Sequence, residues 1–178
     1  MIVSVNIFAT NIDPVVSAQE LCDQHCRSKM QIESAILLQH CFTNQELLSA
    51  PPTKKGQPRK SGKGYFNHPC SVWVRESKEN FMWLIQHALE MFNERDYRWP
   101  TSSPHFTKQF ILWCKDNVDK TVCNNIKQTP FAVAINKDSN CRSIANFDNL
   151  STIEQYRYYI KMDKPFATWT KRQKPEWY

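Results

Sequence analysis

The sequence predicts a mostly α-helical fold in which residues 1–178 form one compact domain with a short extended segment at the N-terminus. Apolar side chains in residues 81–92 recur at the spacing of a single helix face. All three glycines lie within residues 56–64, whereas sheets and tight turns require positive φ angles more often. The chain has 178 residues, 41% of them hydrophobic, which is enough for a substantial core.

The first part of the chain is expected to contain one extended segment and two helices. Residues 2–9 are rich in β-prone side chains and are long enough for one strand or an extended stretch. Asp13 and Pro14 suit the N-cap and first position of a helix that runs to about His25. A second helix is predicted over residues 27–42, where apolar residues again recur at helical spacing.

Four helices are expected in the remainder of the chain. They cover residues 69–76, a long helix containing residues 81–92, residues 104–118 and residues 152–162. The last of these begins at Ser151-Thr152-Ile153-Glu154, which matches a capping box. Residues 124–150 form a long polar stretch for which the pattern predicts no regular element.

Basic and aromatic residues concentrate in a loop, residues 51–67, and in the C-terminal tail, residues 165–178. Lysine and arginine neutralise phosphates, and aromatic rings can stack on bases, so both segments predict binding to double-stranded DNA. Asn67 and His68 stand before a helix N-terminus, which can hold a phosphate. The candidate DNA-binding residues are Lys54, Lys55, Arg59, Lys60, Lys63, Asn67, His68, Arg75, Lys171, Arg172 and Trp177. The alternatives are a solvated loop and a tail whose tryptophans belong to the core.

A candidate catalytic group lies on the predicted helix over residues 27–42. Lys29 and Glu33 are four residues apart and share a face, with Glu33 at the edge of the apolar stripe. Partial burial would raise the pKa of this carboxyl towards the range useful for proton transfer, and a nearby lysine would oppose that effect. Asp23 and His25 would join Glu33 if the chain folds back there. The alternatives are a simple ion pair and a histidine that caps the preceding helix.

The seven cysteines cannot all pair, and the first ten residues lack the basic region of a secretory signal. We therefore expect free thiols and a cytoplasmic protein. The spacing of the cysteines and histidines matches no common zinc pattern, so no metal site and no cofactor are expected. No apolar run approaches the length of a membrane span, so no membrane partner is expected.

Three short motifs give the sequence a resemblance to a known family. They are LCDQH at residues 21–25, followed by a helix with a glutamate, NHPCSVWVRESKENFMWL at residues 67–84, and KPEWY at residues 174–178. With these motifs the chain resembles the phage pyrimidine dimer DNA glycosylases called endonuclease V, and uncharacterised phage proteins with a similar TWTKRQKPEWY ending. The resemblance implies a helical domain that binds duplex DNA and extrudes a nucleotide, with Glu33 in the position of the family glutamate.

The sequence departs from this family at the N-terminus. The family reaction uses the amino group of a threonine exposed by methionine removal, whereas here Met1 is followed by Ile2. Lys29 can replace that amine only if it loses its proton, which the adjacent Glu33 opposes. Two reactions on a flipped pyrimidine therefore stay open, glycosylase-like cleavage and transfer of an amino group or amino acid from a small donor to a modified thymine. The alternative is a non-catalytic DNA- or nucleotide-binding phage protein, for example one that counters a host defence.

Overall fold

The structure is a computed structural model, and it describes residues 5–178. It contains six α-helices: α1 (Pro14–Glu20), α2 (Met30–Leu38), α3 (Pro69–Glu76), α4 (Lys78–Arg98), α5 (Lys108–Asp116) and α6 (Thr152–Asp163). Within the described residues no strand is present, and one isolated bridge joins Ser77 to Asn125. The mostly α-helical prediction is therefore confirmed. Each helix of residues 5–178 is too short or too polar to cross a membrane.

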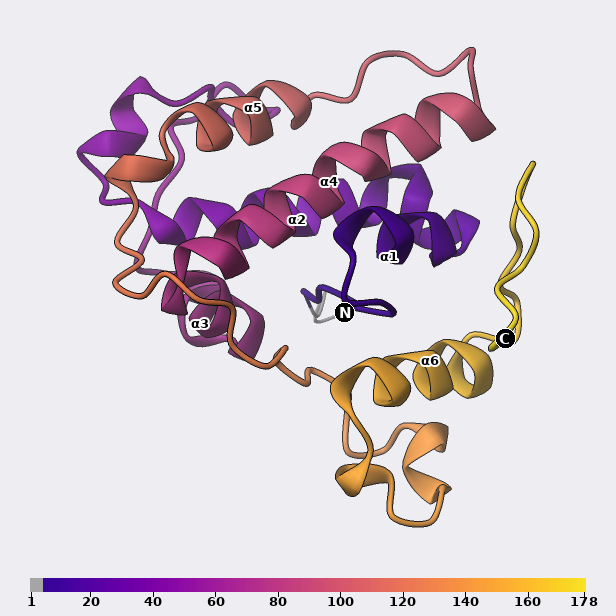
Figure 1. Cartoon of the computed structure of the whole chain (residues 1–178). Helices are drawn as coiled ribbons and strands as arrows, with labels where there is room; N and C mark the ends of the chain where they lie inside the picture. The colour runs from indigo at the N-terminus through magenta and orange to yellow at the C-terminus, as the bar shows by residue number, and fades with distance from the viewer. Residues whose placement is uncertain (1–4) are drawn as a thin grey trace.

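Helix α4 runs through the middle of the molecule, with α5 above it and α6 below it in Figure 1. Helices α1, α2, α3 and α5 all pack against α4. The predicted apolar face of α4 is buried and includes Phe81, Leu84, Ile85, Ala88 and Phe92. Ser77 separates α3 from α4 and caps the longer helix, because its hydroxyl accepts a hydrogen bond from the Asn80 N–H.

Several helix boundaries differ from the prediction for local reasons. Helix α1 starts at its predicted cap, Asp13, but ends at Glu20 because Leu21 is extended. The second predicted helix begins as a π-helix over His25–Lys29 and continues as α2. Helix α5 starts later than predicted, at Lys108. The side chain of His105 accepts a hydrogen bond from the N–H of Thr107, the residue directly before the helix. The capping box at Ser151 and the final helix are confirmed.

The N-terminal segment, residues 5–10, passes through the interior between α1 and α6 (Figure 1), and every one of its residues is buried. It belongs to no helix or strand, so no neighbouring strand can pair its backbone. Side chains do so instead: Ser17 Oγ accepts from the Thr10 N–H at 3.1 Å, and Arg157 Nε donates to the Thr10 carbonyl at 2.8 Å. Of the two expectations for residues 2–9, a strand or an extended stretch, no strand is present over residues 5–9, and residues 2–4 lie outside the described residues.

A buried charge network ties the C-terminal tail to α4. The Arg98 side chain is completely buried and binds Glu94 at 2.9 Å and Asp23 at 3.1 Å. Arg172 of the tail also binds Glu94, and Trp169 Nε1 donates to the Glu20 carbonyl at 2.9 Å. These contacts hold the tail beside the C-terminal end of α4, as Figure 1 shows on the right.

Replacing Arg98 should reveal how much stability this network supplies. Arg98→Met removes the buried cation from Asp23 and leaves Glu94 with Arg172 alone, which we expect to cost about 3–5 kcal/mol of unfolding free energy. Lys78→Met is the control, because Lys78 pairs at the surface with the exposed Asp119 and should cost less than about 1 kcal/mol. Urea denaturation of both variants makes the comparison, and equal losses would contradict the assignment.

Candidate functional site

Glu33 of α2 is the central group of the candidate site. Its side chain is only 2% exposed, and its two carboxylate oxygens have different partners. Lys29 Nζ lies 2.6 Å from Oε1, and the backbone N–H of Asn6 donates to Oε2 at 2.9 Å. Burial raises the pKa of Glu33 against the opposing effects of Lys29 and Asn6. Lys29 is itself 40% exposed, so one side chain connects the buried carboxylate to solvent.

The backbone around Lys29 is unusual because Lys29 is the last residue of the π-helix. A π-helix makes wider turns than an α-helix, and short π-helical turns occur frequently at functional sites. The side chains of Ser28 and Lys29, the last two residues of this turn, contact different parts of the structure. Ser28 binds His105, whereas Lys29 binds Glu33. The π-helix therefore connects Glu33 to the segment before α5.

Asn6 and Phe8 form the wall of the site opposite α2. Asn6 Oδ1 accepts hydrogen bonds from the backbone N–H groups of Ile7 at 2.8 Å and Phe8 at 3.2 Å. Its Nδ2 donates to the Ala134 carbonyl at 2.9 Å. The Asn6 side chain therefore binds both the backbone of its own segment and the backbone at Ala134. Phe8 has a φ of 43°, which is rare for a bulky side chain and marks local strain. Such strain is often found at functional sites.

The ring of Phe8 joins His25 to the Lys29–Glu33 pair. It lies 4.5 Å from the His25 ring and 5.2 Å from Lys29 Nζ. Burial, and then the charges of Lys29 and Lys164, lower the pKa of His25 to about 3. His25 is therefore neutral at pH 7 and cannot act as the cation expected in the helix-capping alternative. His25 and Lys29 thus lie near the same Phe8 ring, and no hydrogen bond joins His25 to Glu33 in the described structure.

Asp23, by contrast, is not part of this cluster. Its carboxylate binds Arg98, the Thr170 N–H and the hydroxyls of Thr168 and Thr170. Burial alone would raise the pKa of Asp23, but hydrogen bonds from Thr170, Thr168 and Arg98 lower it overall. Asp23 holds the tail in place, and no contact joins it to Glu33 in the described structure. The expected support of Glu33 by Asp23 is corrected accordingly.

Two arginines of the predicted DNA surface hold the loop, residues 51–67, in shape. Arg59 is buried, its guanidinium lies 3.7 Å from the centre of the Phe110 ring, and its Nε donates to the Pro51 carbonyl. Arg75 donates to the Phe66 carbonyl at 2.7 Å and lies over the ring of the same residue. Both guanidinium groups therefore have partners within the protein and are not presented to a phosphate. The clustering of basic residues in the sequence does not reveal these contacts.

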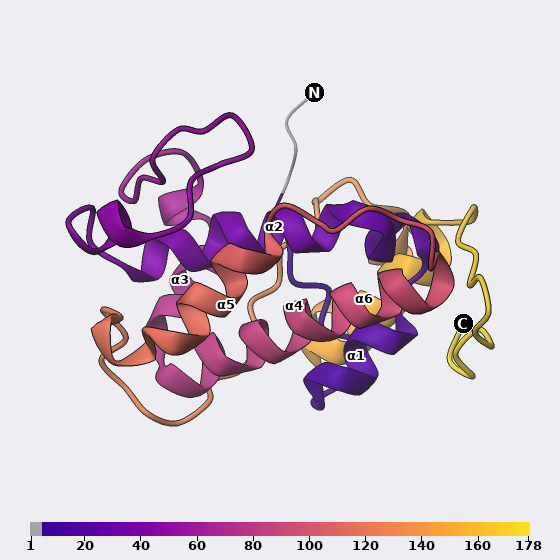
Figure 2. The ribbon, with the colours of Figure 1, turned by 90° about the horizontal axis from the view of Figure 1, so that it is seen from above.

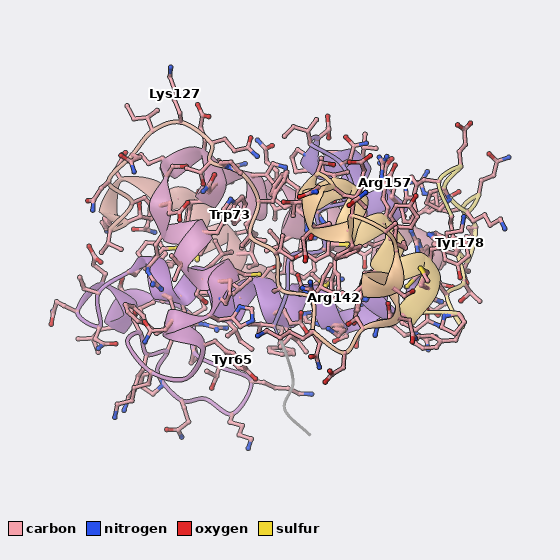
Figure 3. The ribbon with its side chains drawn as sticks, turned by 90° about the horizontal axis from the view of Figure 1, so that it is seen from below. Tyr65, Trp73, Lys127, Arg142, Arg157 and Tyr178 are labelled. Carbon is pink, nitrogen blue, oxygen red and sulfur yellow. The ribbon has the colours of Figure 1, made fainter. Side chains whose placement is uncertain are left out.

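His68 also has a local task. Its Nδ1 accepts a hydrogen bond from the Cys70 N–H and caps α3, and burial lowers its pKa, so it offers no charge to an anion. Asn67 next to it is exposed. The exposed cations of the loop are Lys54, Lys55, Lys60 and Lys63. Figure 2 shows this loop projecting beside α2, and Figure 3 shows Tyr65 near its end.

The tail contributes less to a DNA surface than the sequence suggests. Arg172 is engaged by Glu94, and Trp177 is half-buried with the Arg157 guanidinium 5.6 Å from its ring centre. Lys171 is exposed, and its Nζ donates to the Tyr97 carbonyl at 3.0 Å. Figure 3 shows Arg157 and Tyr178 at this end of the molecule. The alternative in which the tail tryptophans pack against the domain describes Trp169 and Trp177 better.

Sequence reasoning missed Asn6, Phe8 and Lys164. The β-prone residues 2–9 suggested a strand or an extended stretch, and only the tertiary structure shows the side-chain hydrogen bonds of Asn6. Among residues 5–178, no group of three histidine, cysteine, aspartate or glutamate side chains is arranged to hold a metal ion. All seven cysteines are buried free thiols.

Comparison with models of known protein families, with curated proteins and with solved structures found no match to this chain.

Replacing Asn6 tests whether its side chain organises the site. Asn6→Ala removes the acceptor of two buried N–H groups, each worth about 1–3 kcal/mol when left unpaired. We expect the unfolding free energy to fall by at least about 2 kcal/mol. Asn11→Ala is a matched control, because its one hydrogen bond to the Asp13 N–H is exposed and should contribute less than about 1 kcal/mol. Similar losses in thermal or urea denaturation would contradict this role.

Proposed function

We propose that the protein acts on a flipped pyrimidine base in duplex DNA, with Glu33 as the group that transfers a proton. The observation that carries this proposal is the environment of Glu33. A buried carboxylate with a raised pKa, paired with a half-exposed lysine, is an arrangement that general acid–base catalysis uses. The π-helix at Lys29 and the strained Phe8 on either side of the carboxylate add support.

Two reactions suit this carboxylate. In base excision, Glu33 takes a proton from water as the water oxygen bonds to the sugar C1′ and the base leaves with the electrons of the glycosidic bond. In base modification, the nitrogen of a donor amine bonds to the 5-methylene carbon of a modified thymine, and a phosphate-type group departs from that carbon. Glu33 takes the proton that the amine nitrogen loses. The second reaction adds a small amine or amino acid as a partner. Lys29 orients the carboxylate in both.

A duplex hides the reacting atoms of its bases, so such an enzyme must extrude the nucleotide at a cost of a few kcal/mol. Phosphate contacts can offset that cost, and the exposed lysines of the loop are available for them. The loop ends beside the turn that follows α2, where the rings of Phe66 and His40 pack edge-on with 5.6 Å between their centroids. The resemblance of LCDQH and the tail to the phage glycosylases supports the same class of substrate.

A binding protein without catalytic activity is the second candidate. The observation that favours it is that both oxygens of Glu33 already have partners, Lys29 and the Asn6 N–H. In that case Glu33 pairs a buried backbone group and does no chemistry. The exposed loop lysines would bind nucleic acid equally well.

Glu33→Gln separates these two functions. Glutamine can still accept the Asn6 hydrogen bond but cannot take a proton, so turnover should fall by at least about 100-fold with DNA affinity nearly unchanged. Because Lys29 is half-exposed, losing the ion pair should change stability by no more than about 1 kcal/mol. Mass spectrometry of nucleosides from ultraviolet-irradiated, unmodified and 5-hydroxymethyluracil-containing DNA detects the products.

The pH profile gives a second readout of the same variant. The raised pKa of Glu33 leaves the carboxyl protonated at pH values where an ordinary glutamate is ionised. The rate of the wild type should therefore rise with pH through an inflection above the usual glutamate range, and Glu33→Gln should lack this inflection. Full turnover in Glu33→Gln would exclude Glu33 as the proton acceptor.

The loop lysines should set the salt dependence of DNA binding. Replacing Lys55, Lys60 and Lys63 with serine should weaken duplex binding and reduce the slope of log K against log salt by about 3, since each phosphate contact contributes about 0.9. The control replaces the exposed Lys115, Lys120 and Lys127, which lie on other segments, and should leave most of the slope intact. An equal effect of the two triple variants would place the DNA elsewhere.

A further inference from the structure

A second concave site lies outside the Glu33 cluster, between the start of the loop and the segment that leads into α5. Residues 51–54 form one wall and residues 104–112 the other, around a cavity of about 480 Å³. An adjoining cavity of about 350 Å³ shares Pro104, His105 and Lys108 with the first. The larger volume falls within the range of about 300–1,000 Å³ that is typical of small-molecule sites.

The groove offers an aromatic surface to a ligand. Phe106 is 39% exposed and lines the larger cavity, so part of its ring is accessible there. The ring of His105 stacks against it, with 4.9 Å between the centroids and an angle of 21°. Lys54 Nζ lies 5.5 Å from the centre of the Phe106 ring. A planar ligand that stacks on Phe106 would displace the flexible Lys54 ammonium from the ring face to the edge of the ligand.

His105 holds the Phe106 ring in position. Its Nδ1 faces the Thr107 N–H at 3.3 Å, and because a backbone N–H can only donate, this nitrogen is the acceptor. Nε2 then carries the proton and donates to Ser28 Oγ at 2.9 Å. Burial, followed by the charges of Arg95 and Lys54, lowers the pKa of His105 to about 4, so the ring is neutral at pH 7. His105 is therefore a positioning residue and not an anion-binding cation.

Positive charge surrounds the same groove. Lys54 and Lys108 line the larger cavity, and Arg95 and Lys108 line the adjoining one. The only acidic residue lining either cavity is Asp96, which lies 3.6 Å from Arg95. Lys54 and Lys108 are thus left to face an anion next to the exposed ring.

We propose that this groove binds a nucleotide, with the base stacked on Phe106 and the phosphate held between Lys54 and Lys108. An aromatic platform beside two cations matches the two parts of a nucleotide, and base–aromatic stacking is largely independent of base identity. The nucleotide is either free or part of a single strand, since both present the same base and phosphate. The proposal does not require a reaction at Glu33.

The test measures binding of thymidine 5′-monophosphate, thymidine, deoxyribose 5-phosphate and an octamer of deoxythymidylate by isothermal titration calorimetry. Phe106→Ala should weaken binding of the monophosphate or the octamer by about 5- to 100-fold, the usual range for one stacked base. Lys54→Gln should weaken the phosphate-bearing ligands and leave the affinity for thymidine unchanged. Phe166→Ala is the control, because Phe166 is a 55% exposed phenylalanine that lines neither cavity.

Binding of the monophosphate identifies a free-nucleotide site, and binding of the octamer alone identifies a strand site. Either result supports the proposal if Phe106→Ala weakens that binding. Phe106→Leu provides a second variant of similar volume, and thermal denaturation verifies that both variants fold. No binding of the monophosphate or the octamer, or equal affinity in Phe106→Ala and Phe166→Ala, overturns the proposal. Glu33→Gln should bind these ligands as the wild type does, so failure of the reaction at Glu33 is distinguishable from failure of the groove.

Discussion

The structure depends on one constraint: residues 5–10 run through the interior without a strand to pair them. A buried backbone N–H or carbonyl needs a partner, and here side chains must supply it. Glu33, Ser17 and Arg157, together with the side chain of Asn6, are buried or half-buried for this purpose. The polar interior, the strained Phe8 and the raised pKa of Glu33 all follow from the path of this segment.

The same constraint explains why the structural role of Glu33 and the catalytic role that we propose for it meet in one carboxylate. A carboxylate placed inside to accept the Asn6 N–H is desolvated, and desolvation is what shifts a carboxyl pKa towards neutral pH. Lys29, which is half-exposed, forms an ion pair with Glu33 and so stabilises the ionised carboxylate in its buried position. The π-helix that ends at Lys29 also directs Ser28 to His105, so the Glu33 cluster and the groove at Phe106 are held by consecutive residues.

Helices with a clear apolar period or a capping signal were predictable from the sequence. The apolar face of α4, the Asp13 cap of α1 and the capping box of α6 all appear where the pattern places them. The π-helix was not predictable, because its residues fit an α-helix equally well. The pairing of Lys29 with Glu33 followed from their spacing, but the Asn6 contact joins residues 27 positions apart and has no local signal. Charge clustering likewise could not show that Arg59 and Arg75 are occupied by Pro51, Phe66 and Phe110.

The path of residues 5–10 also sets an order on how the chain can fold during synthesis. This segment contacts Ala134 and Arg157, which are made more than 100 residues after it. The partners of Asp23 at residues 168 and 170 come later still. Contacts this distant in sequence form late, because a long loop must close before they are gained. The contacts of this segment with Ser17 and Glu33 can form once α2 has been made, whereas the Ala134 and Arg157 contacts must wait until residue 157 has emerged.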